Sequence, residues 1–142
     1  MCYEKFNINE FQQLLDLMQK YKESISEPIL DSNQVNALKL AAAYNKIEFY
    51  IAKEHDKLIA MCSVCITFST FDCCLSGVFE DFFILPEHRG KGIARGLTQY
   101  VFDELKSRDI TTLWVGCADA DLEMYKSLGF DIPLGNLLTW SV

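Results

Sequence analysis

The feature of this 142-residue chain that most constrains its fold is an uncharged run from Leu58 to Phe71. Its fourteen residues fall short of the roughly 20 that a bilayer span needs, and Ser, Thr and Cys are frequent in it. The first part, Leu58 to Phe68, is almost continuously apolar, which is typical of a strand covered on both faces. The run therefore predicts a buried strand inside a sheet, and no membrane segment.

Periodicity and turn residues divide the rest of the chain into helices and strands. Apolar side chains at helical spacing predict helices over 10–23, 31–45, 93–108 and 119–129. Asn9 is the expected N-cap of the first helix, Asp31 or Ser32 that of the second, and Gly129 the end of the last. Strands are expected over 3–6, 47–53, 58–68, 74–85, 111–117, 130–133 and 137–142.

The order of these elements predicts an α/β (α+β) fold. Two helices come first, then a meander of strands, then a strand–helix–strand crossover. We expect one domain over 1–142, with a mixed central sheet of about six to seven strands flanked by about four helices. Half of the residues are hydrophobic, which is enough to build a core and excludes disorder as the main state.

The charge balance narrows the possible partners. The chain has 13 Lys and Arg against 20 Asp and Glu, a net charge of -7. This balance argues against nucleic acid, whose phosphates need a basic surface, and favours a cationic small molecule. The N-terminus lacks the basic-then-apolar pattern of a signal peptide, so we expect a cytoplasmic protein without a membrane anchor.

Six cysteines raise the question of a metal or redox site. Cys62 and Cys65 have the Cys-x-x-Cys spacing but lie in the apolar run. Residues three apart on a strand face opposite ways, so these two thiols could not converge on one metal. We therefore expect no metal and interpret the cysteines as buried free thiols, with a thiol-based metal or redox protein as an alternative.

The segment with the clearest chemistry runs from Glu80 to Arg95. A strand ends at Pro86, a charged loop with two glycines follows, and a helix begins at once. Glycines let a backbone approach a ligand closely, and the free N–H groups of a first helical turn favour a phosphate. Three cations, Arg89, Lys91 and Arg95, lie within seven residues of this acidic chain. The segment predicts a diphosphate site, although a solvated strand-to-helix turn would have a similar composition.

Two well-known phosphate loops do not match this segment. A Walker A loop needs Ser or Thr after Gly-Lys, but Gly92 follows Lys91. The dinucleotide fingerprint needs a third glycine at position 95, where the chain has Arg95.

The order Arg89-x-x-Gly92-x-Ala94 resembles the acetyl-CoA pyrophosphate signature of the Gcn5-related N-acetyltransferases (GNAT), Arg/Gln-x-x-Gly-x-Gly/Ala. Downstream, Tyr125-Lys-Ser-Leu-Gly-Phe130 is similar to the Tyr-x-x-x-Gly-Phe helix end of that family. The two blocks occur in the family's order, separated by one helix and one strand. The resemblance covers about 80–130 and implies an acetyl-CoA-dependent N-acetyltransferase of the GNAT fold.

The resemblance also implies roles for individual residues. Tyr125 would be the general acid that protonates the departing CoA thiolate. Backbone groups on the fourth strand would pair with the pantetheine arm, and a strand N–H near Phe83 would stabilise the oxyanion. Backbone N–H groups of the loop and first helical turn would hold the pyrophosphate. These expected acetyl-CoA-binding residues are Phe82, Phe83, Ile84, Arg89, Gly90, Lys91, Gly92, Ile93, Ala94 and Arg95.

Two adjacent carboxylates, Glu80 and Asp81, precede the loop in an otherwise apolar strand. The run Glu-Asp-Phe-Phe resembles the spermidine/spermine N-acetyltransferase branch, in which acidic residues help to hold a cationic acceptor. In a regular strand the two would face opposite ways, so only one would reach a common cleft unless a bulge redirected them. A contrary feature is Ala118, which stands where many relatives carry a cofactor-contacting Asn.

We therefore expect an enzyme that transfers acetyl from acetyl-CoA to a primary amine of a small, cationic, polyamine-like acceptor. The amine attacks the thioester directly, and Glu80 or Asp81, or a water held by one of them, takes the amine proton. The alternative is a non-catalytic acyl-CoA-binding or sensing module. Homodimer assembly is left open, and the sequence does not name the acceptor.

Overall fold

The computed structural model describes residues 1–141. One five-stranded sheet runs in the order β1-β2-β3-β4-β5, antiparallel except for the parallel pair of β4 and β5. The strands are β1 (Cys2–Lys5), β2 (Glu48–Glu54), β3 (Lys57–Ser69), β4 (Cys74–Ile84) and β5 (Leu113–Val115). The helices are α1 (Phe11–Ser24), α2 (Ser32–Ala43), α3 (Ile93–Ser107) and α4 (Leu122–Ser127), with short 3-10 turns η1 (Ile8–Glu10), η2 (Pro86–His88) and η3 (Asp119–Asp121).

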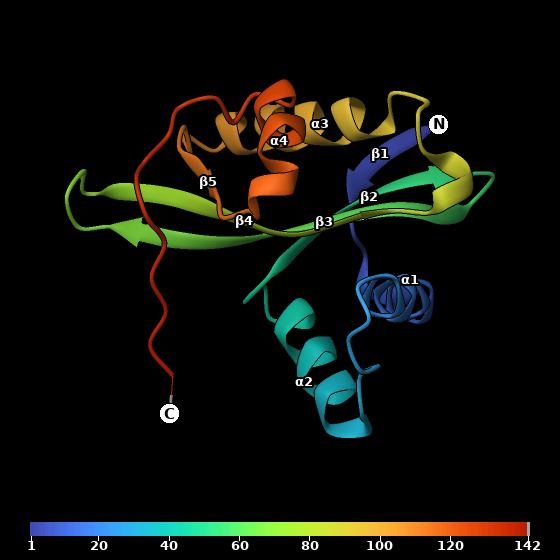
Figure 1. Cartoon of the computed structure of the whole chain (residues 1–142). Helices are drawn as coiled ribbons and strands as arrows, with labels where there is room; N and C mark the ends of the chain where they lie inside the picture. Colours follow the sequence, from blue (N-terminus) through green and yellow to red (C-terminus); the bar gives the residue numbers. More distant parts are fainter. Residues whose placement is uncertain (142) are drawn as a thin grey trace.

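The sheet is covered on both faces, as the uncharged run predicted. Helices α3 and α4 lie over one face and α1 and α2 over the other (Figure 1). β3 lies in the middle of the sheet and is buried from Leu58 to Val64. Apolar side chains of α1 pack on one face, and Ile93, Leu97 and Val101 of α3 pack on the other. The mixed α/β class and the four helices are confirmed.

The sheet has five strands in the described residues, so the expected count of six to seven is wrong. Residues 130–133 and 137–141 form no strand, and Val142 of the expected last strand lies outside the described residues. Phe130 is drawn into an aromatic cluster with Phe79, Pro133 has no N–H for a ladder, and Gly135 has a φ of 98°. The apolar composition resembled that of a strand, but these three features prevent an extended, paired backbone.

The helix starts confirm one expected cap and correct another. Asp31 caps α2 through a capping box in which its side chain accepts from the Gln34 backbone N–H and the Gln34 side chain accepts from the Asp31 N–H. Asn9 does not cap α1. The side chain of Asn7 instead caps η1, by accepting from the Asn9 N–H at 2.9 Å. The helix α1 follows that turn directly and has no side-chain cap.

An ion cluster ties the start of β2 to the end of α3. The Glu48 side chain is 6% exposed and accepts two hydrogen bonds from Arg108, at 2.7 and 3.0 Å. The Tyr50 hydroxyl donates to the same carboxylate at 2.8 Å, and Lys5 lies 3.3 Å away. The carboxylate is thus surrounded by donors, which is the condition under which burying a charge is tolerable.

The cysteines are less buried than expected. Cys62 is fully buried, Cys65 is half-buried, and the other four are exposed. Burial alone raises the pKa of the Cys62 thiol. Among residues 1–141, no three or more His, Cys, Asp and Glu side chains lie together as a metal site would require. No helix in this part of the chain has both the length and the apolar surface to cross a bilayer.

Candidate active site

The candidate site lies where β4 and β5 part. The two strands pair only over Gly77–Phe79 and Leu113–Val115, although β4 continues to Ile84. Beyond Phe79, the β4 edge on the β5 side has no strand partner in the part of the chain that is described. A cleft of about 570 Å³ opens along this edge. It is lined by β4, by the loop before α3, and by residues of α1 and α4.

The loop before α3 is shaped by two left-handed glycines. Gly90 and Gly92 have φ values of 73° and 79°, and Gly92 is the N-cap of α3 with no side chain to cap the helix. A Cβ at either glycine would meet no atom within 4 Å, so both face open space. The N–H groups of the first turn have no partner within the helix. This arrangement leaves a cradle of N–H groups at the positive end of a helix dipole, which is suited to a diphosphate.

The cations of this loop do not all face the cleft. The Arg89 side chain folds back onto β4, donating from Nε to the Ile84 carbonyl at 3.0 Å. Its guanidinium lies 5.7 Å from the centre of the Phe83 ring. Lys91 and Arg95 are exposed and are not among the residues that line the cleft, within the described chain. Backbone groups of the loop, more than its side-chain charges, therefore form the cradle.

The backbone direction of β4 decides which N–H groups are free for a ligand. The Leu85 N–H donates to the Ile59 carbonyl of β3 at 2.9 Å, so Leu85 and Ile59 are a hydrogen-bonded pair of the ladder. Antiparallel ladders alternate, so the next such residue back along β4 is Phe83, paired with Met61. Phe82 and Ile84 therefore direct their backbone groups to the open edge. These two N–H groups are the candidates for the oxyanion donor expected near Phe83.

Tyr125 is positioned by the end of α4. Gly129 has a φ of 112°, and its N–H donates to the Lys126 carbonyl at 3.1 Å. The Phe130 N–H donates to the Tyr125 carbonyl at 3.1 Å. This is a Schellman ending, which needs the left-handed conformation that glycine adopts easily. It folds Phe130 back so that its ring lies 5.8 Å from that of Tyr125, and both rings pack on Phe79. The Tyr-x-x-x-Gly-Phe pattern thus fixes a phenol in the wall of the cleft.

The electrostatics of Tyr125 keep it protonated. Burial, followed by the neighbouring Tyr21 and Asp121, raises the pKa of Tyr125 to about 12. A phenol in this state donates a proton and does not accept one at neutral pH. The side chain can therefore supply a proton to a group leaving within the cleft.

The two carboxylates lie in a β-bulge. Cys62 pairs with Phe82 and Val64 with Phe79, so Glu80 and Asp81 together oppose Ser63. The Ser63 hydroxyl holds the bulge by accepting from the Asp81 N–H at 3.2 Å. Glu80 is exposed, whereas Asp81 is half-buried on the side of α1. Neither side chain is among the described residues that line the cleft.

Several cleft residues carried no signal in the sequence. Tyr21 at the end of α1, and Asp121 and Met124 near the start of α4, complete the walls, and His88 of η2 lies beside the loop. Tyr21 packs on Phe83, with ring centres 5.6 Å apart. These positions come from elements distant in sequence, so only the folded arrangement reveals them.

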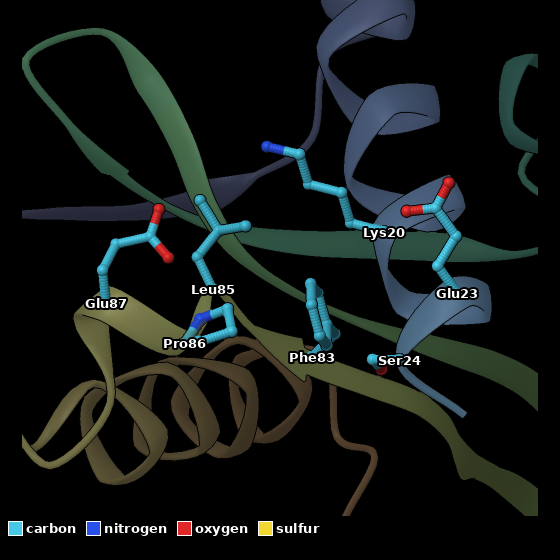
Figure 2. A pocket seen from close by; sticks show the side chains of 7 residues that line it. All are labelled: Lys20, Glu23, Ser24, Phe83, Leu85, Pro86 and Glu87. Atoms are coloured by element: carbon cyan, nitrogen blue, oxygen red, sulfur yellow. The ribbon is translucent and has the colours of Figure 1, made fainter. Parts of the chain in front are cut away.

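A second hollow of about 430 Å³ lies between α1 and the end of β4. Figure 2 shows Phe83 between the two elements, with Glu23 of α1 on one side and Glu87 on the other. Phe83 and Ser24 border both spaces, so the hollow adjoins the cleft. Two carboxylates and Lys20 give it a mixed, predominantly acidic lining.

Comparison with known protein families identifies the family of this chain. The model of the acetyltransferase (GNAT) domain matches residues 45–132, which is more than half of the chain. The chain belongs to the GNAT acetyltransferases. The matched region contains β4, the glycine loop and Tyr125, which form most of the cleft, whereas the wall from α1 lies outside the match. No curated protein sequence matches the chain significantly.

Solved structures show the same GNAT fold over nearly the whole chain. A probable acetyltransferase is 18% identical, with a TM-score of 0.89, over 100% of this chain and 99% of that one. A predicted acetyltransferase from Clostridium acetobutylicum, with acetyl-CoA, is 20% identical, with a TM-score of 0.81, over 99% and 95%. An aminoglycoside acetyltransferase from an uncultured soil metagenomic sample, in complex with sisomicin, is 10% identical, with a TM-score of 0.87, over 99% and 95%. At these identities the likeness concerns the fold.

Proposed function

We propose that this GNAT domain binds acetyl-CoA in the cleft and transfers its acetyl group to a primary amine of a small, cationic acceptor. One observation carries the proposal: the open β4 edge connects a cradle of helix N–H groups to a protonated phenol. These are the parts that hold a diphosphate and protonate a leaving thiolate. The acetyl-CoA complex of the clostridial structure supports the choice of co-substrate.

Different parts of the cleft would bind the diphosphate, the pantetheine arm and the thioester. Backbone N–H groups from Gly90 to Arg95 would hold the diphosphate, since the Arg89 N–H already donates to the Pro86 carbonyl at 3.2 Å. At the open edge, the Ile84 N–H would pair with the pantetheine arm, and the Phe82 N–H would polarise the thioester carbonyl. Acetyl-CoA, when bound, supplies the activated acetyl group.

The chemistry is direct transfer. The neutral amine attacks the thioester carbon, a carbon–nitrogen bond forms, and the carbon–sulfur bond breaks. Tyr125 would donate its proton to the departing sulfur, since its raised pKa keeps that proton in place until the thiolate forms. We propose that Asp81, half-buried in the bulge, takes the amine proton through a bound water, because its side chain is not among the described residues that line the cleft.

A cationic, polyamine-like acceptor is favoured by the carboxylates around the site. Asp121 lines the cleft, Glu23 and Glu87 border the adjoining hollow, and the chain carries a net charge of -7. An acceptor with a second positive charge would bind more tightly, because these carboxylates make the electrostatic potential of the site negative. The aminoglycoside acetyltransferase of the same fold was solved with sisomicin, which supports small amine acceptors in general.

The test is acetyl-CoA turnover with a linear diamine and with the monoamine of equal chain length. We expect the diamine to have the higher kcat/KM, and Asp121→Asn and Glu87→Gln to reduce its advantage, each by about fivefold for a charge pair near 1 kcal/mol. High salt should reduce the advantage as well. A preference for the monoamine, unaffected by salt and by both variants, contradicts the cationic acceptor. Tight acetyl-CoA binding without turnover of any amine favours the non-catalytic alternative.

We also propose that two copies associate through the C-terminal segment 132–141. Its five large apolar side chains are 71–90% exposed, and the segment has no charged residue. Together they expose on the order of the 800 Å² per partner that a stable interface needs. Within residues 1–141, the outer edge of β5 has no strand partner, and the strand has no charged residue, so one copy could offer a segment to the edge of another. Light scattering should find a dimer that truncation after Phe130 disrupts, and a monomeric full-length chain contradicts it.

A further inference from the structure

We propose that the side chain of Arg89 makes this chain selective for acetyl thioesters that carry a diphosphate. In the protein alone, Arg89 occupies a backbone acceptor of β4 that a pantetheine arm needs. A diphosphate in the neighbouring loop draws the guanidinium away from that acceptor. The inference rests on the proposed acetyl transfer and deepens it, because it names the feature of the co-substrate that the site selects.

The role of Arg89 lies in its side chain, because its backbone adds nothing to the cradle of N–H groups. The Arg89 N–H donates to the Pro86 carbonyl at 3.2 Å, and the His88 N–H donates to the Leu85 carbonyl at 2.9 Å. These two bonds close the η2 turn at the end of β4. The turn lets the Arg89 side chain fold back onto β4, beside the cleft that this residue helps to line.

The Arg89 side chain covers part of the open edge of β4. Its Nε donates to the Ile84 carbonyl at 3.0 Å, and its Cζ lies 5.7 Å from the centre of the Phe83 ring. Phe83 and Leu85 form hydrogen-bonded pairs with β3, so the Ile84 carbonyl is one of the groups that β4 turns to the cleft. A ligand that adds to a strand edge bonds to the main-chain groups of that edge. Arg89 therefore occupies an acceptor for a pantetheine amide N–H.

The contacts of Arg89 hold its side chain without burying it. The residue is exposed, and within residues 1–141 its guanidinium takes part in no salt bridge. A hydrogen bond to a neutral carbonyl and an exposed cation–π contact are each weaker than the paired, charge-assisted bonds that a guanidinium makes to a phosphate. A diphosphate beside the loop can therefore displace Arg89 from β4 with a net decrease in free energy.

The position of Arg89 couples the two halves of the co-substrate. Gly90 follows Arg89 directly, and Gly90 and Gly92 line the same cleft as Arg89 and Ile84. A thioester with a diphosphate thus frees the Ile84 carbonyl for its own pantetheine arm. A pantetheine thioester without a diphosphate must compete with Arg89 for that carbonyl, and nothing in such a ligand offsets the cost.

The first experiment compares acetyl-CoA with acetyl-pantetheine, which lacks the diphosphate, in NMR titrations of wild type and Arg89→Met. We expect Arg89→Met to bind acetyl-CoA about fivefold more weakly, because the diphosphate loses a charged partner. The same variant should bind acetyl-pantetheine about threefold more tightly, because the Ile84 carbonyl is then free. A residue with only a structural role would weaken both ligands. The matched control is Lys106→Met, which removes an exposed cation from the last turn of α3 and should change neither affinity.

The second experiment separates the charge of Arg89 from its hydrogen bond. Arg89→Lys keeps a positive charge but places a methylene group where the Nε–H stands. We expect this variant to bind acetyl-pantetheine as tightly as Arg89→Met does. Its affinity for acetyl-CoA should stay within about twofold of wild type, since lysine still binds phosphate as a point charge.

The two ligands together decide whether the coupling exists. Affinities for acetyl-CoA and acetyl-pantetheine that change in the same direction in Arg89→Met overturn the coupling and leave acetyl-CoA binding intact. An unchanged affinity of this variant for acetyl-pantetheine overturns it as well. Absence of acetyl-CoA binding to the wild-type protein overturns the proposed function and the coupling together. If Arg89→Met fails to fold, an Arg89→Lys protein with wild-type affinity for acetyl-pantetheine still overturns the coupling.

Discussion

Arg108→Met is expected to lower the free energy of unfolding by about 3 kcal/mol, because removing the partly exposed arginine leaves the buried carboxylate that it pairs with poorly compensated. The carboxylate left behind belongs to Glu48, which is 6% exposed and loses two hydrogen bonds, of 2.7 and 3.0 Å. Methionine keeps much of the apolar contact made by the arginine stem. The loss therefore reports the missing guanidinium rather than a cavity.

The magnitude follows from which partners remain. Removing one partner of a buried pair typically destabilises by about 3–5 kcal/mol. Tyr50 still donates at 2.8 Å and Lys5 still lies 3.3 Å away, so the low end of that range applies. For a chain of this length, about 3 kcal/mol corresponds to a decrease in Tm of about 10 °C.

Urea unfolding at a series of pH values is the appropriate assay. Burial alone would raise the pKa of Glu48, but the hydrogen bonds from Arg108 and Tyr50 and the charge of Lys5 outweigh it, so this pKa lies below its ordinary value. A depressed folded-state pKa stabilises the fold above the unfolded-state pKa, and this contribution is lost as pH falls through the folded-state value. The difference between wild type and Arg108→Met should therefore be largest at neutral pH and shrink in acid.

The matched control is Arg95→Met, which removes an exposed arginine from the same helix. Surface substitutions of this kind usually stay within about 0.5 kcal/mol. If Arg108→Met is as stable as Arg95→Met at neutral pH, the cluster around Glu48 does not stabilise the fold. A difference that grows in acid would contradict the assigned pKa direction.

Two further predictions concern the cleft. Gly92→Glu should abolish acetyl-CoA binding in calorimetry, because the glutamate side chain would enter the open space before α3. Circular dichroism should still show a folded chain. Unchanged affinity for acetyl-CoA would mean that this loop does not bind the diphosphate. Tyr125→Phe should lower kcat by a factor on the order of 10²–10⁴ and leave acetyl-CoA affinity intact; wild-type turnover would mean that water or another group protonates the thiolate.

Local patterns predicted most of the architecture correctly. The uncharged run located the central strand, Asp31 or Ser32 was expected as the cap of α2, and the apolar stripe of α3 located the helix behind the loop. These elements are determined by periodicity and capping within one segment. The C-terminal segment was mistaken for strands because its composition favours strand, while Pro133 and Gly135 prevent a paired strand.

The site was predicted only in part, because its walls come from separate elements. The glycine loop and the end of α4 are short local motifs, so Gly92 and Tyr125 could be found in the sequence. Tyr21 could not, since it lies more than a hundred residues before Tyr125 in an ordinary amphipathic helix. The bulge at Glu80 and Asp81 was left as an open alternative, since it depends on how β4 pairs with β3.

The bulge in β4 gives this strand one residue more than its pairing with β3 requires. Side chains alternate along a strand, so the extra residue switches which face each later side chain meets. Phe82 consequently packs in the cluster beneath α3, while Phe83 packs against α1. Deleting either Glu80 or Asp81 would leave one residue opposite Ser63, so Phe82 would still pair with Cys62 and the two faces of the strand would stay as they are. Evolution and protein engineering can therefore vary or remove either carboxylate, because the bulge absorbs the loss of one residue.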